Sequence, residues 1–153
     1  MAEKMGEQEK TEAIRRINEY YGSSFTTEFT LLKKDEKDGE KIFIYSGGEI
    51  PKLPLEWVGL HLATIAQDVL LSIEGAQMVG KTAAKTIEIT RQQADELMRG
   101  LDLNYAGEIR GYVILKQAQN IIGVCIAEEG KITNTLPKSR RTVRNTKEEI
   151  GKA

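Results

Sequence analysis

Residues 75–82 read GAQMVGKT and match, at every specified position, the phosphate-binding loop pattern of Gly, four residues, Gly, Lys and a hydroxyl residue. In such a loop, backbone N–H groups and the lysine hold the phosphates of a nucleotide, and the hydroxyl holds magnesium. The pattern needs a substantial helix that begins at Lys81 and Thr82. The sequence becomes alternating and β-branched within four residues of Thr82 instead, in KTIEIT. We therefore expect Gly75 and Gly80 to interrupt or close a helix, and a nucleotide-binding loop is the less favoured alternative.

A second group of residues that could bind a ligand lies near the C-terminus. Between Lys131 and Lys147 the chain carries six basic residues and no acidic one, although the whole chain has 22 Lys and Arg against 23 Asp and Glu. Clustered cations that adjoin strands are typical of surfaces that bind polyanions such as RNA. A solvated basic tail is the alternative interpretation of the same pattern.

The other candidates for catalysis or metal binding stand alone. His61 alternates with leucines and has no carboxylate or thiol beside it in the sequence, so we expect a surface-facing strand residue. Cys125 lies in the apolar run VCIA without a basic neighbour, which favours a buried, unreactive thiol. Trp57 is expected to pack where two units of the fold meet rather than to stack on RNA. We predict no catalytic residue, no metal site and no cofactor.

Composition indicates the compartment. The single cysteine excludes a disulfide within the chain and fits a reducing environment. The charged N-terminus lacks the apolar stretch of a signal peptide, and no apolar run approaches the ~20 residues that span a bilayer. We expect a soluble, cytoplasmic protein.

Periodicity predicts the elements that position these residues. An amphipathic helix is expected over residues 11–21, ended by Gly22, followed by two antiparallel strands around the turn DEKDG. Two Gly and two Pro in GGEIPKLPLEW indicate a connection and a domain boundary near residue 55.

The remaining two thirds of the chain predict a mixed fold. GLHLATI reads as a short strand, QDVLLSIEGAQMVG favours helix, and KTIEIT reads as a half-buried strand. A helix should begin after Thr90, with Gln93 completing a capping box, and stop at Gly100. Three further strands are expected in GYVILK, IIGVCIA and KITNTL.

The order of these motifs resembles the PUA-like RNA-binding module, especially the version at the C-terminus of Sun-family RNA cytosine-5 methyltransferases. The resemblance covers roughly residues 55–145. It rests on Gly59, Leu60, Arg99, Gly100, Gly111, Tyr112, Val113, Gly123, Asn134, Leu136, Pro137, Lys138 and Arg141. The N-terminal helix and hairpin resemble, more loosely, the pre-PUA unit of small ribosome-biogenesis factors. The chain lacks the cofactor loop and the catalytic Pro-Cys motif of the methyltransferases.

The resemblance implies an α+β fold with a pre-PUA-like unit at residues 1–54, a PUA-like mixed β pseudobarrel with two short helices at 55–145, and a tail at 146–153. It implies a noncatalytic protein that binds structured rRNA or tRNA in RNA modification or ribosome biogenesis, with an RNA methyltransferase or ribosome-assembly factor as a possible partner. The expected RNA-binding residues are Lys138, Arg140, Arg141, Arg144, Lys81, Lys85 and Tyr112. The alternatives are a protein-interaction adapter in a ribosome-assembly complex and, less favoured, a nucleotide-binding protein.

Overall fold

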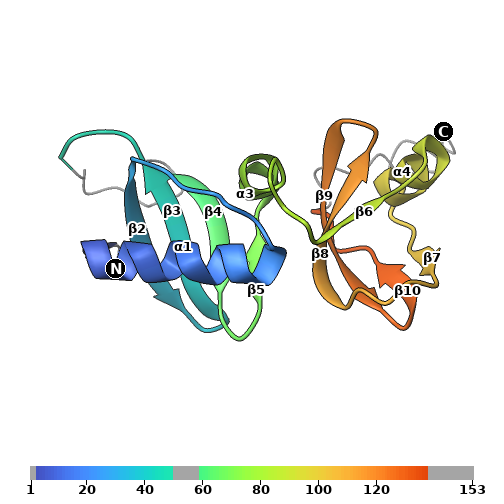
Figure 1. The fold of residues 1–153 in the computed structure, drawn as a ribbon, viewed down its shortest axis with the longest axis horizontal. Helices are drawn as coiled ribbons and strands as arrows, with labels where there is room; N and C mark the ends of the chain where they lie inside the picture. Colours follow the sequence, from blue (N-terminus) through green and yellow to red (C-terminus); the bar gives the residue numbers. More distant parts are fainter. Residues whose placement is uncertain (1–2, 50–58, 138–153) are drawn as a thin grey trace, which may run out of the picture. The chain divides into compact units, whose positions relative to one another are not determined.

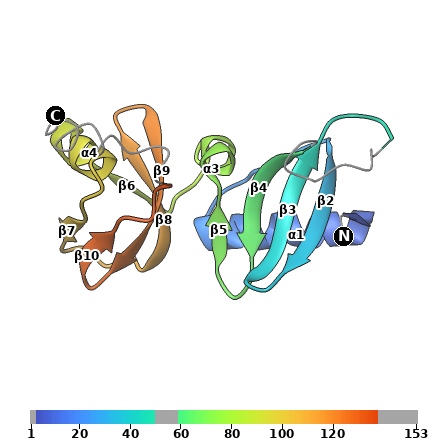
Figure 2. The ribbon, with the colours of Figure 1, turned by 180° about the vertical axis from the view of Figure 1, so that it is seen from behind.

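A computed structural model of the protein describes residues 3–49 and 59–137 (Figures 1 and 2). These residues form three helices and two five-stranded sheets, which confirms the α+β class. The chain divides into two compact units, Met1–Lys85 and Thr86–Ala153. The division differs from the sequence-based boundary near residue 55, because the strand in GLHLATI pairs with the N-terminal hairpin and so belongs to the first sheet.

The first unit is an antiparallel sheet with strand order β1-β2-β3-β4-β5. Its strands are β1 (Glu3–Lys4), β2 (Thr30–Glu36), β3 (Gly39–Tyr45), β4 (Leu60–Ile65) and β5 (Val69–Leu71). The predicted hairpin is confirmed: Thr30 of β2 lies opposite Tyr45 of β3, and Glu36 lies opposite Gly39. The two-residue strand β1 carries no alternating pattern and was not expected.

Helix α1 (Glu7–Tyr21) lies across one face of this sheet in both views (Figures 1 and 2). Its apolar stripe of Ala13, Ile17 and Tyr21 is buried, as the helical spacing predicts. Gly22 ends the helix in the left-handed region, with φ 61°. A residue with a Cβ is disfavoured in that conformation, so the predicted C-terminus is confirmed.

Tyr21 links α1 to the edge strand β5. Its side chain is fully buried, and its hydroxyl donates to the Val69 carbonyl oxygen at 2.5 Å. We expect Tyr21→Phe to lower the free energy of unfolding by about 1 kcal/mol, since a buried acceptor loses its donor. Urea denaturation checks this value. Tyr45→Phe is the matched control, because the Tyr45 hydroxyl donates to Glu49 at an exposed site and its loss should change stability by less than about 0.5 kcal/mol.

Helix α3 (Ile73–Val79) follows β5 directly and completes the first unit. Ser72 caps its N-terminus: the Ser72 hydroxyl accepts from the Gly75 amide at 2.9 Å and donates to the His61 carbonyl on β4 at 2.5 Å. The segment QDVLLSIEGAQMVG is therefore a short strand and then a helix, rather than helix throughout.

The second unit is a curled sheet with order β6-β8-β9-β10-β7, packed with one helix. Its elements are β6 (Thr86–Glu88), α4 (Arg91–Met98), β7 (Leu103–Tyr105), β8 (Gly111–Gln117), β9 (Asn120–Glu128) and β10 (Gly130–Thr133). Strand β6 runs parallel to β8, and the other pairs are antiparallel. The capping box at Thr90 and Gln93 is present as predicted.

The core of the second unit joins helix and sheet. Leu97 of α4, Val113 and Leu115 of β8, and Cys125 of β9 are all fully buried in it. The prediction of a buried thiol at Cys125 is confirmed. Over residues 3–49 and 59–137, no helix is long and apolar enough to cross a membrane.

Candidate functional site

The GAQMVGKT segment is a helix and a turn. Gly75 lies inside α3, and Gly80 ends that helix with its amide donating to the Ala76 carbonyl at 2.8 Å. Lys81 and Thr82 stand in the turn that follows, so no helix begins at them. The arrangement lacks the helix N-terminus that a nucleotide-binding loop needs at this position.

The first glycine of the motif is explained by packing. A Cβ atom at position 75 would stand 2.1 Å from the carbonyl oxygen of Leu62, and the Ser72 amide donates to the same oxygen at 3.1 Å. Helix α3 therefore approaches the backbone of β4 more closely than a side chain at position 75 allows.

The residues after the motif close the end of α1. The Thr82 hydroxyl accepts from the Ser24 amide at 2.9 Å, and the amides of Ala84 and Lys85 both donate to the Tyr21 carbonyl at 3.0 Å. The bonds from Ala84 and Lys85 are accepted by the carbonyl of the last residue of α1, where the intrahelical bonds end. They also fix the positions of Lys81 and Lys85 on the first unit.

The two predicted lysines of this region have different surroundings. Lys85 is half-buried, and its Nζ lies 3.8 Å from the centre of the Tyr20 ring, a cation–π contact. Burial lowers the pKa of the Lys85 ammonium, an effect that the nearby Asp68 carboxylate opposes. Lys81 is exposed. Of the two, Lys81 is the cation that is open to a ligand.

Lys81 stands at an apolar cleft of about 520 Å³ in the first unit. The apolar part of its lining consists of Phe25, Phe29, Ile44, Leu60 and Met78. The hydroxyl-bearing residues Ser24, Thr26, Thr27, Ser46 and Thr82 complete it, and Lys81 is the one charged residue among those that line it. Phe29 is 52% exposed and Leu60 is 41% exposed, whereas most large apolar side chains in the described ranges are buried.

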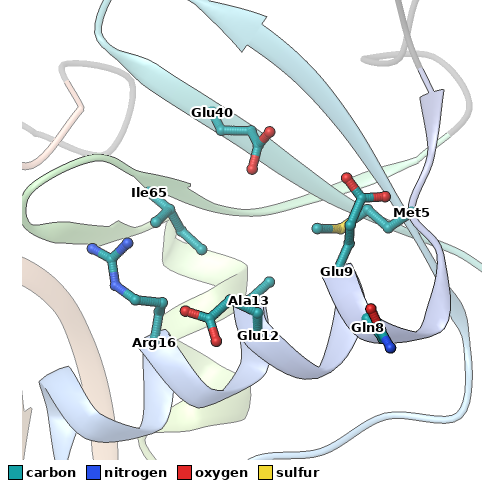
Figure 3. A pocket seen from close by; sticks show the side chains of 8 residues that line it. All are labelled: Met5, Gln8, Glu9, Glu12, Ala13, Arg16, Glu40 and Ile65. Atoms are coloured by element: carbon teal, nitrogen blue, oxygen red, sulfur yellow. The ribbon is translucent and has the colours of Figure 1, made fainter.

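A second cleft, of about 310 Å³, lies between α1 and the sheet, and the charged residues of its lining are mostly acidic (Figure 3). Glu9 and Glu12 reach it from α1 and Glu40 from β3, over an apolar floor that includes Ile65. Its Arg16 donates to the Ala66 carbonyl at 2.5 Å.

The carboxylates of this acidic cleft have cationic partners within the chain. Glu9 pairs with Lys33, and this hydrogen bond lowers the pKa of the Glu9 carboxyl. Glu12 pairs with Arg15, which lowers its pKa in the same way. Burial raises the pKa of Glu40, which lies 4.0 Å from Lys33. Glu9 and Glu12 are therefore engaged in ion pairs, and the described residues contain no cluster of His, Cys, Asp and Glu able to hold a metal.

His61 and Tyr112 are strand residues in different units. His61 of β4 is a half-buried strand residue, with its ring tilted against Phe43 at a centroid distance of 5.2 Å. Tyr112 lies on β8, opposite Ile126 of β9, and is also half-buried. Tyr112 therefore belongs to the second unit, whereas Lys81 and Lys85 belong to the first.

The main predicted RNA-binding residues, Lys138, Arg140, Arg141 and Arg144, lie outside the described residues, as do Trp57 and the tail at 146–153. The described residues just before Lys138 are held by several hydrogen bonds. The Asn134 side-chain amide donates to the carbonyls of Leu97 and Leu101, at 2.8 and 2.9 Å, and its Oδ1 accepts from the Leu136 amide at 3.0 Å. Leu136 is buried in the core of the second unit.

These bonds attach the chain just before Lys138 to the C-terminal end of α4. The backbone N–H of Asn134 donates a further bond to the Asp102 carboxylate at 2.8 Å, and the Thr135 hydroxyl donates to the Val124 carbonyl at 2.9 Å. Sequence reasoning identified Asn134 and Leu136 by resemblance but gave neither a physical role. It did not identify Phe29 and named Leu60 only for the resemblance, because an apolar residue at or beside the end of a strand has the same sequence pattern whether it is buried or exposed.

No protein-family model and no curated protein sequence matches this chain.

Proposed function

We propose that the chain is a noncatalytic RNA-binding protein that acts on structured rRNA or tRNA in RNA modification or ribosome biogenesis. In this proposal the second unit is the core of a PUA-like module, and the basic stretch from Lys138 to Arg144 contacts phosphates. The partner is RNA, alone or together with a methyltransferase or assembly factor that supplies the chemistry.

The observation that carries the proposal is the distribution of charge around the Asn134 attachment. Residues 86–137 carry five Lys and Arg against seven Asp and Glu, whereas residues 138–153 carry six against two. The positive charge of this unit is thus concentrated beyond Pro137. Asn134 and Leu136 hold the residues just before Lys138 against the end of α4 and the core of the second unit. Fixing one end of a binding segment reduces the conformational entropy that it loses on binding.

Lys81 is the secondary phosphate contact in this proposal. It is exposed, whereas Lys85 has its ammonium over the Tyr20 ring and a lowered pKa, which make Lys85 the weaker candidate. Tyr112, half-buried on β8, is the residue proposed to stack on a base.

RNA affinity measured across a salt series tests the proposal. Changing Lys138, Arg140 and Arg141 together to Ala should weaken binding of ribosomal or transfer RNA by about tenfold or more at low salt. It should also make the dependence of log affinity on log salt shallower by about 0.7–0.9 for each lost phosphate contact. Fluorescence anisotropy with labelled RNA gives both values.

The matched control changes Lys34, Lys37 and Lys41 of the β2–β3 hairpin to Ala, which removes the same total charge from the first unit. If the two triple variants lose affinity and salt dependence equally, binding depends on net charge alone and the proposed site is refuted. The proposed site is also refuted if the wild-type chain binds RNA no better than the C-terminal variant.

A further inference from the structure

The apolar cleft at Lys81 is not used by RNA binding at the C-terminal stretch, so its role is a separate question. We infer that it docks a short segment of a protein partner that presents a bulky apolar side chain beside an Asp or Glu. The inference leaves the proposed RNA site at the C-terminal stretch unchanged, but it competes with the secondary phosphate contact proposed above for Lys81.

The apolar part of the inference rests on two half-exposed side chains. Phe29 and Leu60, at 52% and 41% exposure, are two of the three large apolar residues that the described ranges leave exposed, and both line this cleft. Exposed apolar side chains gathered in one hollow, rather than scattered singly, mark interaction sites. Met78 adds a flexible side chain of the kind that adapts to different apolar partners.

The positive charge of Lys81 at the cleft favours a partner segment that carries an acidic residue. Lys81 is the one charged residue of the lining, and no carboxylate stands among the lining residues to balance it. An acidic residue next to the inserted apolar side chain would complete this pair. The electrostatic match would add specificity and a faster association rate.

The local loops are already organised to form the cleft. The Thr82 hydroxyl accepts from the Ser24 amide at 2.9 Å, and the Thr27 hydroxyl accepts from the Phe29 amide at 3.2 Å. These bonds hold the Phe29 side of the cleft and the Lys81 side in place without a ligand. A preformed site loses little conformational entropy when a partner binds.

The same lining argues for a protein rather than RNA at this site. Single-stranded nucleic acid is held by a row of cations along the backbone with aromatic faces for successive bases. Here one cation stands among the lining residues, and Phe29 is the one exposed aromatic side chain among them, since Phe25 is buried, so the lining offers neither a row of cations nor a series of aromatic faces.

Selection of a random displayed peptide library on the full chain tests the inference, followed by affinity measurement with the enriched peptides. We expect the enriched peptides to share a bulky apolar residue within a few positions of an Asp or Glu. Phe29→Ser should weaken their binding by about tenfold or more, and Lys81→Glu by about fivefold. In the wild type, the changes in amide chemical shift on peptide binding should be confined to residues around the cleft. Phe29 is half-exposed, so its replacement should leave the fold intact.

Two matched controls separate the site from general effects. Leu101→Ser removes an exposed apolar side chain of the second unit, and Lys37→Glu reverses an exposed charge away from the cleft, so both should leave affinity unchanged. The inference is overturned if no peptide is enriched, or if the cleft variants bind as the wild type does. It is also overturned if peptides bind only after residues 51–57 are replaced by Gly and Ser, which would make the chain's own segment the occupant. Shifts at Phe29 and Lys81 caused by oligouridylate instead of peptide would assign the cleft to RNA.

Discussion

Gly75→Ala is expected to lower the free energy of unfolding of the first unit by about 2 kcal/mol, although alanine is the better helix former. Alanine in place of glycine inside a helix gains about 1 kcal/mol, so propensity alone predicts stabilisation. The new Cβ, however, would stand 2.1 Å from the Leu62 oxygen and 3.1 Å from its carbonyl carbon. These are backbone atoms of a central strand and have no flexible side chain to move aside. Overpacking of this kind costs about 1–3 kcal/mol or more, and here the upper end applies.

Urea denaturation and amide hydrogen exchange, followed peptide by peptide, measure the effect. Faster exchange should be confined to α3 and the strands of the first sheet, since local stability differs between units. Gly48→Ala is the matched control, because its Cβ would meet no atom within 4 Å, and its stability should change by less than about 0.5 kcal/mol. A stable Gly75→Ala variant would mean that α3 does not pack closely on β4, and the nucleotide-loop interpretation of GAQMVGKT would regain support.

Gly75 also shows where sequence reasoning reached its limit. The pattern of glycines, lysine and threonine matches a phosphate-binding loop, yet two local observations were enough to disfavour it: the early return of alternation after Thr82 and the short space for a helix. Both concern neighbours in sequence. The close approach of Leu62 to Gly75, which explains the glycine, is a contact between separate elements and has no signature in the local sequence.

The same division holds for the fold. The end of α1 at Gly22, the capping box at Thr90 and the hairpin turns were predictable, because each depends on residues a few positions apart. The sheet to which β4 belongs was not predictable, since an alternating strand pattern specifies which faces are buried but not which strand lies beside it. For that reason the expected boundary near residue 55 and the observed division after Lys85 differ.

The candidate sites divide in a similar way. Charge clustering identified the C-terminal run, because a count along the chain suffices for it. The surroundings of each basic side chain, in contrast, could be known only from the structure. Lys81 and Lys85 are four residues apart in the sequence, but Lys81 stands exposed at an apolar cleft and Lys85 lies over the Tyr20 ring. Asn134 gave no chemical signal either, because an asparagine after a strand is ordinarily read as part of a turn.

Asn134→Ala is expected to lower the stability of the second unit by about 2–3 kcal/mol and to weaken RNA binding without removing any charge. The substitution deletes the side-chain bonds to Leu97, Leu101 and Leu136. Each is worth about 1 kcal/mol, and the sum is somewhat reduced because water can reach the bond to Leu101. The backbone bond to Asp102 is retained. Asn104→Ala on β7 makes the same chemical change at an exposed position and should be near neutral in urea denaturation.

The effect of Asn134→Ala on RNA affinity separates two contributions of the basic run to binding: its attachment to the second unit and its charge. If Lys138, Arg140 and Arg141 contact phosphates from a fixed starting point, releasing that point adds an entropic cost to binding but leaves the number of contacts unchanged. RNA affinity should then fall several-fold while the salt dependence keeps the wild-type slope, in contrast to the shallower slope of the triple alanine variant. Affinity must be measured at a temperature where circular dichroism shows the variant to be folded. Wild-type affinity in the folded Asn134→Ala variant would mean that the basic run binds RNA as an independent tail, and the link proposed between the α4 attachment and RNA recognition would have to be abandoned.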